Sequence, residues 1–142
     1  MKRPHKILII DDEKESCAEI QEYFTEQGFI AETAFDGEAG LKKLRTNEFD
    51  VAIVDIRMPK MNGIEVAQHI YQEGIDTEII MLTGHGDRKE AVAAVKAHVT
   101  DWIDKDEVTM PLLLNKVKAL TEIFPPEEIS RFLSSFPSKN EK

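Results

Sequence analysis

Short apolar runs alternate with amphipathic stretches along the chain. Five runs are rich in aliphatic and β-branched residues, at 7–10, 29–34, 51–54, 78–82 and 102–103. Their hydrophobicity is mostly continuous rather than alternating, which is typical of strands covered on both faces of a parallel sheet. The pattern therefore predicts five buried strands.

A stretch with helical periodicity follows each apolar run. The helices are expected at 14–27, at 37–46, from 62 or 63, from 87 and from 109. The first carries Cys17, Ile20 and Phe24 on one face, which predicts that Cys17 is a buried core residue rather than a reactive thiol. Strands and helices that alternate in this way predict an α/β fold, a (βα)5 chain whose right-handed crossovers place helices on both faces of one parallel sheet.

The helix expected from residue 87 has little to bury. Asp87 and Glu90 have the spacing of a capping box. Its apolar stripe is thin and consists of Ala91, Val92, Ala94 and Val95. A helix that buries so little apolar area can shift at low cost.

The length of 142 residues suits one domain with one hydrophobic core. A Pro-Pro break follows Phe124. We expect residues 124–142 to form a C-terminal tail, with a short helix within 127–134 and a disordered end. No linker to a second domain is expected.

Charge and composition argue against some classes of binding partner and location. The net charge is −9 and the isoelectric point is about 4.9, so repulsion argues against direct binding of nucleic acid or of anionic membranes. The first apolar run is too short for the core of a signal peptide, and no run approaches the length of a membrane span. We therefore expect a cytoplasmic protein.

Acidic residues stand where the first and third predicted strands end. Asp11 and Asp12 follow the first run, and Asp55 follows the third. In an open parallel sheet, ligands bind beyond the carboxyl ends of the strands, where the strand order reverses. If these two strands are neighbours, three carboxylates share one crevice, and their repulsion favours a bound cation. Oxygen ligands suit Mg²⁺, whereas the histidines form no cluster with Cys17 that would indicate zinc.

Two more strand ends supply hydrogen-bond donors. Thr83 ends the fourth run and Lys105 follows the fifth. These donors beside the acids indicate phosphoryl chemistry, in which Asp55 attacks phosphorus while a metal and Lys105 neutralise charge on the phosphoryl oxygens. Each residue alone is more often a turn former, a helix cap or a surface charge. Their shared position at four strand ends favours one site.

Four segments of the sequence together resemble the receiver domain of two-component response regulators. They are Ile7–Glu13, Val54–Gly63, Met81–Gly84 and Asp101–Lys105. The resemblance implies a receiver domain at residues 5–123. It also implies a flavodoxin-like fold, a doubly wound parallel sheet of five strands in the order 2-1-3-4-5.

The resemblance implies roles for the acidic residues. Asp55 would accept a phosphoryl group from a sensor histidine kinase or a phosphotransfer protein. Mg²⁺ would be bound directly by Asp12, partly through water by Asp11, and also by Asp55 and the backbone carbonyl of Arg57.

The resemblance also implies switching residues at the last two strand ends. The Thr83 hydroxyl would turn toward the phosphoryl group, Lys105 would pair with that group, and Gly84 would keep the phosphoryl pocket open. Trp102 stands where the family has a rotating aromatic residue, more often Tyr or Phe. It is either such a switch or a large residue that only covers the short fifth strand.

Two departures from the family pattern concern the loops beside the fifth strand. Asp106 follows Lys105, where the family usually has Pro in a cis bond. Because a non-proline cis bond costs about 3–4 kcal/mol, a trans bond is predicted. His98 and Val99 replace the usual Gly-Ala, so His98 must adopt a left-handed conformation at some cost or avoid it.

The predicted function is a phosphorylation-dependent switch rather than an enzyme, catalysing only its own phosphorylation and dephosphorylation. Phosphate on Asp55 would change the surface of the fourth helix, fifth strand and fifth helix, which then binds a downstream protein or a second copy of the chain. Arg57 and His85 are expected to tune the lifetime of the phosphoryl group, in a direction left open.

The alternatives are a phosphorylation-independent interaction module, a phosphatase with an aspartyl-phosphate intermediate, and a regulatory fragment of a longer transcriptional or enzymatic regulator. The phosphatase would need an acid where Arg57 stands.

Overall fold

Strands and helices alternate in the structure as the hydrophobic pattern predicts. The computed structural model describes residues 3–84, 88–122, 131 and 133–135. The strands are β1 (Lys6–Ile10), β2 (Ile30–Ala34), β3 (Val51–Asp55), β4 (Glu78–Thr83) and β5 (Asp101–Asp104). The helices are α1 (Lys14–Glu26), α2 (Gly37–Thr46), α3 (Gly63–Gln72), α4 (Arg88–Lys96) and α5 (Met110–Thr121).

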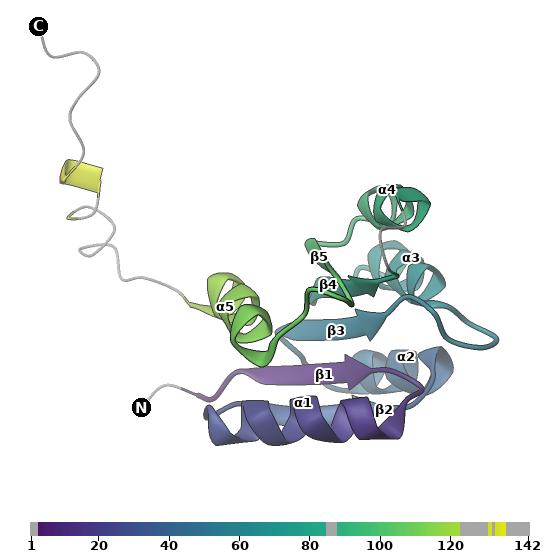
Figure 1. Cartoon of the computed structure of the whole chain (residues 1–142), viewed down its shortest axis with the longest axis horizontal. Helices are drawn as coiled ribbons and strands as arrows, with labels where there is room; N and C mark the ends of the chain where they lie inside the picture. Colours follow the sequence, from purple (N-terminus) through teal and green to yellow (C-terminus); the bar gives the residue numbers. More distant parts are fainter. Residues whose placement is uncertain (1–2, 85–87, 123–130, 132, 136–142) are drawn as a thin grey trace, which may run out of the picture.

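The strands form one parallel sheet in the order β2-β1-β3-β4-β5 (Figure 1). This is the predicted order, and it makes β1 and β3 neighbours. Ile10 of β1 pairs with Val54 of β3. The next residue on each chain is therefore an aspartate, Asp11 beside Asp55, and the register brings the predicted acids together.

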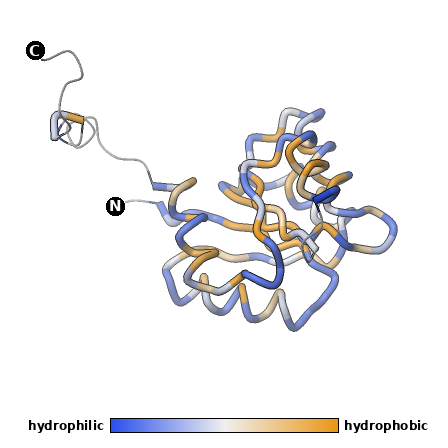
Figure 2. The backbone as a smooth tube through the Cα atoms, turned by 45° about the horizontal axis from the view of Figure 1, so that its top comes forward, coloured by the Kyte–Doolittle hydropathy of each residue, from blue (hydrophilic) through white to orange (hydrophobic). Residues whose placement is uncertain are grey.

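Alternate residues of each strand serve two separate layers of core. In β1, Leu8 and Ile10 pack with the core under α2, α3 and α4, whereas Ile7 and Ile9 pack with the core under α1 and α5. Figure 1 shows these two sets of helices on opposite faces of the sheet, and Figure 2 shows hydrophobic segments running through its centre. Burial on both faces explains why the strands read as continuous apolar runs.

Helix α4 is attached by few side chains. Ala94 is buried, but Val92 and Val95 are 45% and 54% exposed. The expected stripe is therefore wrong for the two valines, because helical geometry points only Ala94 and the following Ala97 at the sheet. Asp87, the first half of the predicted capping box, lies outside the described residues.

The departures around β5 have defined conformations. His98 has a φ of 64°, so it adopts the left-handed conformation instead of avoiding it. Its ring stacks on Tyr71 with centroids 3.8 Å apart. The described residues contain no cis peptide bond, and the bond between Lys105 and Asp106 is trans as predicted.

Most of the predicted tail lies outside the described residues, and so does most of the short helix expected within 127–134. The division at residues 5–123 and 124–142 stays a prediction. Among the described residues, no helix has the length and apolar character required to cross a membrane.

Candidate functional site

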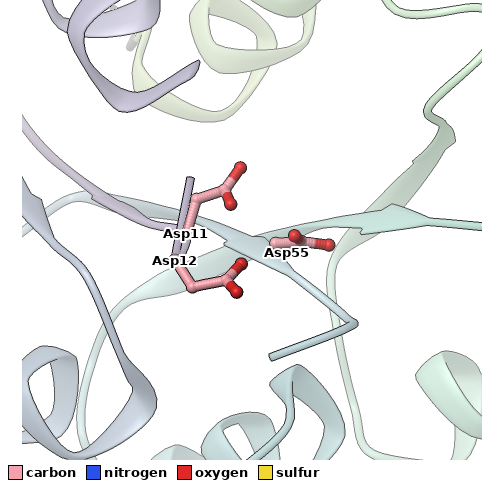
Figure 3. A group of neighbouring side chains, drawn as sticks. All are labelled: Asp11, Asp12 and Asp55. Atoms are coloured by element: carbon pink, nitrogen blue, oxygen red, sulfur yellow. The ribbon is translucent and has the colours of Figure 1, made fainter. Parts of the chain in front are cut away.

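Three carboxylates meet beyond the ends of β1 and β3. Asp11, Asp12 and Asp55 each offer a carboxylate oxygen, and these oxygens lie within 4.8 Å of one another. Figure 3 shows the three side chains gathered in one place. Asp11 and Asp55 are buried and Asp12 is exposed. An all-oxygen set that is partly open to solvent fits a hard divalent cation such as Mg²⁺.

Asp55 is held by two donors. The backbone N–H of Arg57 donates to Asp55 Oδ1 at 3.1 Å, and Lys105 Nζ lies 2.8 Å from the same oxygen. Lys105 comes directly after β5, and its own N–H donates to the carbonyl of Thr83. The structure thus brings the third, fourth and fifth strand ends together around Asp55.

The pKa of Asp11 is shifted upward in the site. Burial, together with the charge of the neighbouring Asp55, raises the pKa of Asp11 to about 6, although the N–H of Glu13 opposes the shift. The raised pKa reflects burial of the carboxyl first and, in smaller part, the repulsion expected when acids share a crevice. A cation bound here would relieve that repulsion.

Cys17 lies beneath the acidic cluster but takes no part in it. Its side chain is 1% exposed, and Sγ donates to the backbone carbonyl of Asp11 at 3.3 Å. Burial raises the pKa of the thiol to about 11. The prediction that Cys17 is a buried core residue is confirmed, and the raised pKa keeps the thiol protonated.

Thr83 and Trp102 border one cavity. Thr83 is buried, and its hydroxyl donates to the carbonyl of Ile103 at 3.4 Å. Trp102 is 41% exposed. A cavity of about 470 Å³ lies between them, and its lining includes Thr83, Gly84, Trp102 and Lys116.

Gly84 and Arg57 are joined by a residue that the sequence did not single out for the site. Glu90 Oε2 lies 2.8 Å from Arg57 Nε, and Glu90 Oε1 accepts the Gly84 N–H at 2.6 Å. A Cβ atom added to Gly84 would lie 2.6 Å from Arg57 Nη2. The absence of a side chain at position 84 therefore leaves room for the guanidinium group.

Gly63 was part of the resemblance but was given no role. A Cβ atom at this position would lie 2.5 Å from the backbone oxygen of Asp55 and 2.8 Å from Cα of Ile56. Only glycine lets α3 begin this close to the end of β3. The spacing of Gly63 from Asp55 in the motif was the available signal.

The matched region of the sequence identifies the family. Residues 7–118 match the response regulator receiver domain. The chain belongs to this family. The strand order and the acidic cluster agree with that assignment, and receiver domains are components of signal transduction.

Curated relatives of this receiver domain are longer proteins. The chain is 33% identical over 100 residues to the alkaline phosphatase synthesis transcriptional regulatory protein PhoP of Bacillus subtilis, covering 70% of this chain and 42% of PhoP. It is 38% identical over 104 residues to the probable transcriptional regulator ycf27 of Cyanidium caldarium, covering 73% of this chain and 41% of ycf27. The chain spans about half or less of the length of these relatives.

Solved structures share the fold across nearly their whole length. The receiver domain of the Francisella response regulator 1452 superposes with a TM-score of 0.77 at 29% identity, covering 83% of this chain and 96% of that one. The response regulator TrrA of Thermotoga maritima, in complex with Mg²⁺ and BeF, has a TM-score of 0.73 at 33% identity and covers 82% of this chain and 98% of TrrA.

Proposed function

We propose that this receiver domain is a phosphorylation-dependent switch whose acceptor is Asp55. The observation that carries the proposal is the position of Asp55, which is buried, belongs to a group of three carboxylates and lies 2.8 Å from the ammonium of Lys105. A nucleophilic carboxylate needs positive charge around it to receive an anionic phosphoryl group. Lys105 supplies part of that charge.

The group transfer needs one bond to form and one to break. A carboxylate oxygen of Asp55 attacks phosphorus as the bond from phosphorus to a phosphohistidine nitrogen breaks, and the nitrogen keeps the electron pair. The donor is a histidine kinase or a phosphotransfer protein. The Arg57 N–H orients the carboxylate at 3.1 Å, and Lys105 offsets charge on the phosphoryl oxygens. Mg²⁺, held by Asp11, Asp12, Asp55 and the backbone carbonyl of Arg57, would add positive charge at the same place when bound.

The signal would leave the site through Thr83 and Trp102. In the phosphorylated state the Thr83 hydroxyl leaves the Ile103 carbonyl and donates to the phosphoryl group. The space that this opens, with the adjoining cavity of about 470 Å³, admits the Trp102 ring. The surface of α4, β5 and α5 then changes shape and binds a downstream protein or a second copy of the chain.

The proposal is tested by intact-protein mass after incubation with acetyl phosphate. We expect one added phosphoryl group that requires both Mg²⁺ and Asp55, so neither the metal-free protein nor Asp55→Asn should gain mass. Failure of the folded wild type both to gain mass and to bind beryllofluoride would reject the switch and favour the phosphorylation-independent module.

A second proposal rests on the length of the relatives. Two relatives named as transcriptional regulators extend well beyond the region they share with this chain. The domain would then regulate an attached effector that binds DNA, while the acidic receiver domain itself does not. Determining whether the reading frame continues past residue 142, and assaying DNA binding of any longer product with and without phosphate, would decide this.

A further inference from the structure

Glu90 ties together two loops that flank the acidic cluster. Its side chain is only 18% exposed although it lies in the first turn of α4. One carboxylate oxygen pairs with the Arg57 guanidinium, two residues beyond Asp55, and the other accepts the N–H of Gly84, one residue beyond Thr83. Glu90 therefore connects the ends of β3 and β4 at the site.

The two groups that Glu90 binds are donors that suit an oxyanion. A backbone N–H at a strand end and a planar guanidinium are both common partners of phosphoryl oxygens. Gly84 and Arg57 flank the strand ends that present Thr83 and Asp55. A phosphoryl group on Asp55 and the carboxylate of Glu90 would thus compete for donors in the same small region.

We propose that Glu90 acts as an internal substitute for the phosphoryl group, holding Gly84 and Arg57 in the unphosphorylated protein and yielding them when Asp55 is phosphorylated. The inference rests on the proposed function of Asp55 and adds the residue that sets how readily the site takes up its anion. It also explains the glycine at position 84, because a Cβ atom there would lie 2.8 Å from Glu90 Oε1 and against the guanidinium.

The competition makes α4 part of the switch. Glu90 sits on a helix whose only buried side chain is Ala94. Release of Glu90 removes two polar contacts from this weakly packed helix. Occupation of the site is in this way connected to the α4 surface without any contact between the phosphoryl group and the outer face of the helix.

The test is the affinity of the whole chain for beryllofluoride in the presence of Mg²⁺. Calorimetry would compare wild type with Glu90→Ala, which removes both contacts, and Glu90→Gln, which keeps an acceptor for Gly84 but loses the charge. Because a competing interaction is lost, Glu90→Ala should bind about five- to tenfold more tightly than wild type, with Glu90→Gln between the two. In Glu90→Ala without beryllofluoride, the Gly84 amide proton should resonate upfield of its wild-type position, because the N–H has lost its acceptor.

Two matched controls separate competition from simpler effects. Glu73→Ala breaks an equivalent ion pair, with Arg45 Nε at 2.7 Å, at the opposite edge of the sheet. Glu38→Ala removes a negative charge from the first turn of α2, which also lies beyond the carboxyl ends of the strands. Both should bind beryllofluoride as wild type does.

Each outcome decides the inference. Equal or weaker binding by Glu90→Ala overturns it, and so does an equal gain in Glu38→Ala, because charge alone would then account for the effect. Binding by Glu90→Ala where wild type binds nothing measurable supports it strongly. Absence of beryllofluoride binding in every variant overturns the inference, and together with no gain of mass from acetyl phosphate it rejects the proposed function as well.

Discussion

Lys105 Nζ and Asp55 Oδ1 form an ion pair of 2.8 Å that joins the ends of β5 and β3 across β4. Asp55 is almost fully buried, whereas the Lys105 side chain is 37% exposed. The lysine is therefore a cation that offsets charge of the clustered carboxylates in the metal-free protein. This places Lys105 in competition with Mg²⁺, while both help an incoming phosphoryl group.

Lys105→Ala should have opposite effects on metal and phosphate. Removing a positive charge beside Asp55 should strengthen Mg²⁺ binding by about three- to tenfold, because the metal no longer meets repulsion from the ammonium. Phosphorylation by acetyl phosphate at saturating Mg²⁺ should slow by at least about tenfold, because one neutralising charge is lost. Calorimetry and the rate of mass gain measure the two effects.

Lys116→Ala is the control for the lysine variant. Lys116 pairs with Asp101 at 2.6 Å, away from the acidic cluster. Lys116→Ala should change neither the Mg²⁺ affinity nor the rate of phosphorylation. Weaker Mg²⁺ binding by Lys105→Ala would contradict the view that lysine and metal compete.

Mg²⁺ affinity should depend on the protonation of Asp11. The pKa of Asp11 is raised to about 6 in the metal-free protein, so a proton must leave before a cation can bind below this pH. Mg²⁺ binding should therefore weaken about tenfold as pH falls from 7 to 5, and change little from 7 to 8. Calorimetric titrations with Mg²⁺ at pH 5, 7 and 8 measure this dependence of the affinity on pH.

Asp11→Asn supplies the reference for that measurement. The variant should bind Mg²⁺ more weakly at pH 7 but lose most of the dependence between pH 5 and 7. If the Mg²⁺ affinity of Asp11→Asn still depends on pH between 5 and 7, the proton that competes with Mg²⁺ belongs to another group.

Much of the fold and the acidic site could be predicted because local patterns encode them. Continuous apolar runs indicate strands buried on both faces, and an aspartate at a strand end comes to the same edge as its neighbour once β1 and β3 pair. Whether His98 adopts a left-handed conformation could be posed as a question from the sequence, but its φ of 64° and its stacking on Tyr71 are seen only in the folded chain.

The remaining features depend on contacts between distant parts of the chain. Arg57 and Glu90 are 33 residues apart, and nothing around Glu90 distinguishes a residue that binds Arg57 from an ordinary helix cap. The exposure of Val92 and Val95 likewise depends on how α4 is rotated against the sheet. A thin apolar stripe leaves that rotation poorly specified.

Two glycine substitutions should differ in cost. In Gly63→Ala the new Cβ atom meets backbone atoms of Asp55 and Ile56 at 2.5 and 2.8 Å, so α3 must move and the free energy of unfolding should fall by about 2–4 kcal/mol. In Gly84→Ala it meets the ends of flexible side chains, and the loss should stay below about 1 kcal/mol. Urea unfolding of both variants gives the comparison, and similar losses would contradict it.

Trp102 should report on the state of Thr83. The indole is 41% exposed beside a cavity of about 470 Å³, so movement inward would take it out of water. Addition of beryllofluoride and Mg²⁺ should shift its emission to shorter wavelength, and Thr83→Ala should bind the anion with a smaller shift. Since Trp102 is the only tryptophan, an unchanged spectrum in wild type would leave it as a residue that only covers β5.

Tyr71 and His98 should be coupled energetically. Their rings stack at 3.8 Å and 11°, which is worth about 0.5–1 kcal/mol, while the φ of 64° at His98 costs about 1 kcal/mol. His98→Gly relieves the strain but loses the stack, so the free energy of unfolding should change little. Tyr71→Ala should then cost about 0.5–1 kcal/mol in wild type and close to nothing in the glycine background.

A double-mutant cycle of Tyr71→Ala and His98→Gly, measured by urea unfolding, tests this coupling. If Tyr71→Ala is equally costly in both backgrounds, the stack contributes nothing and the left-handed histidine must be stabilised by the surrounding loop.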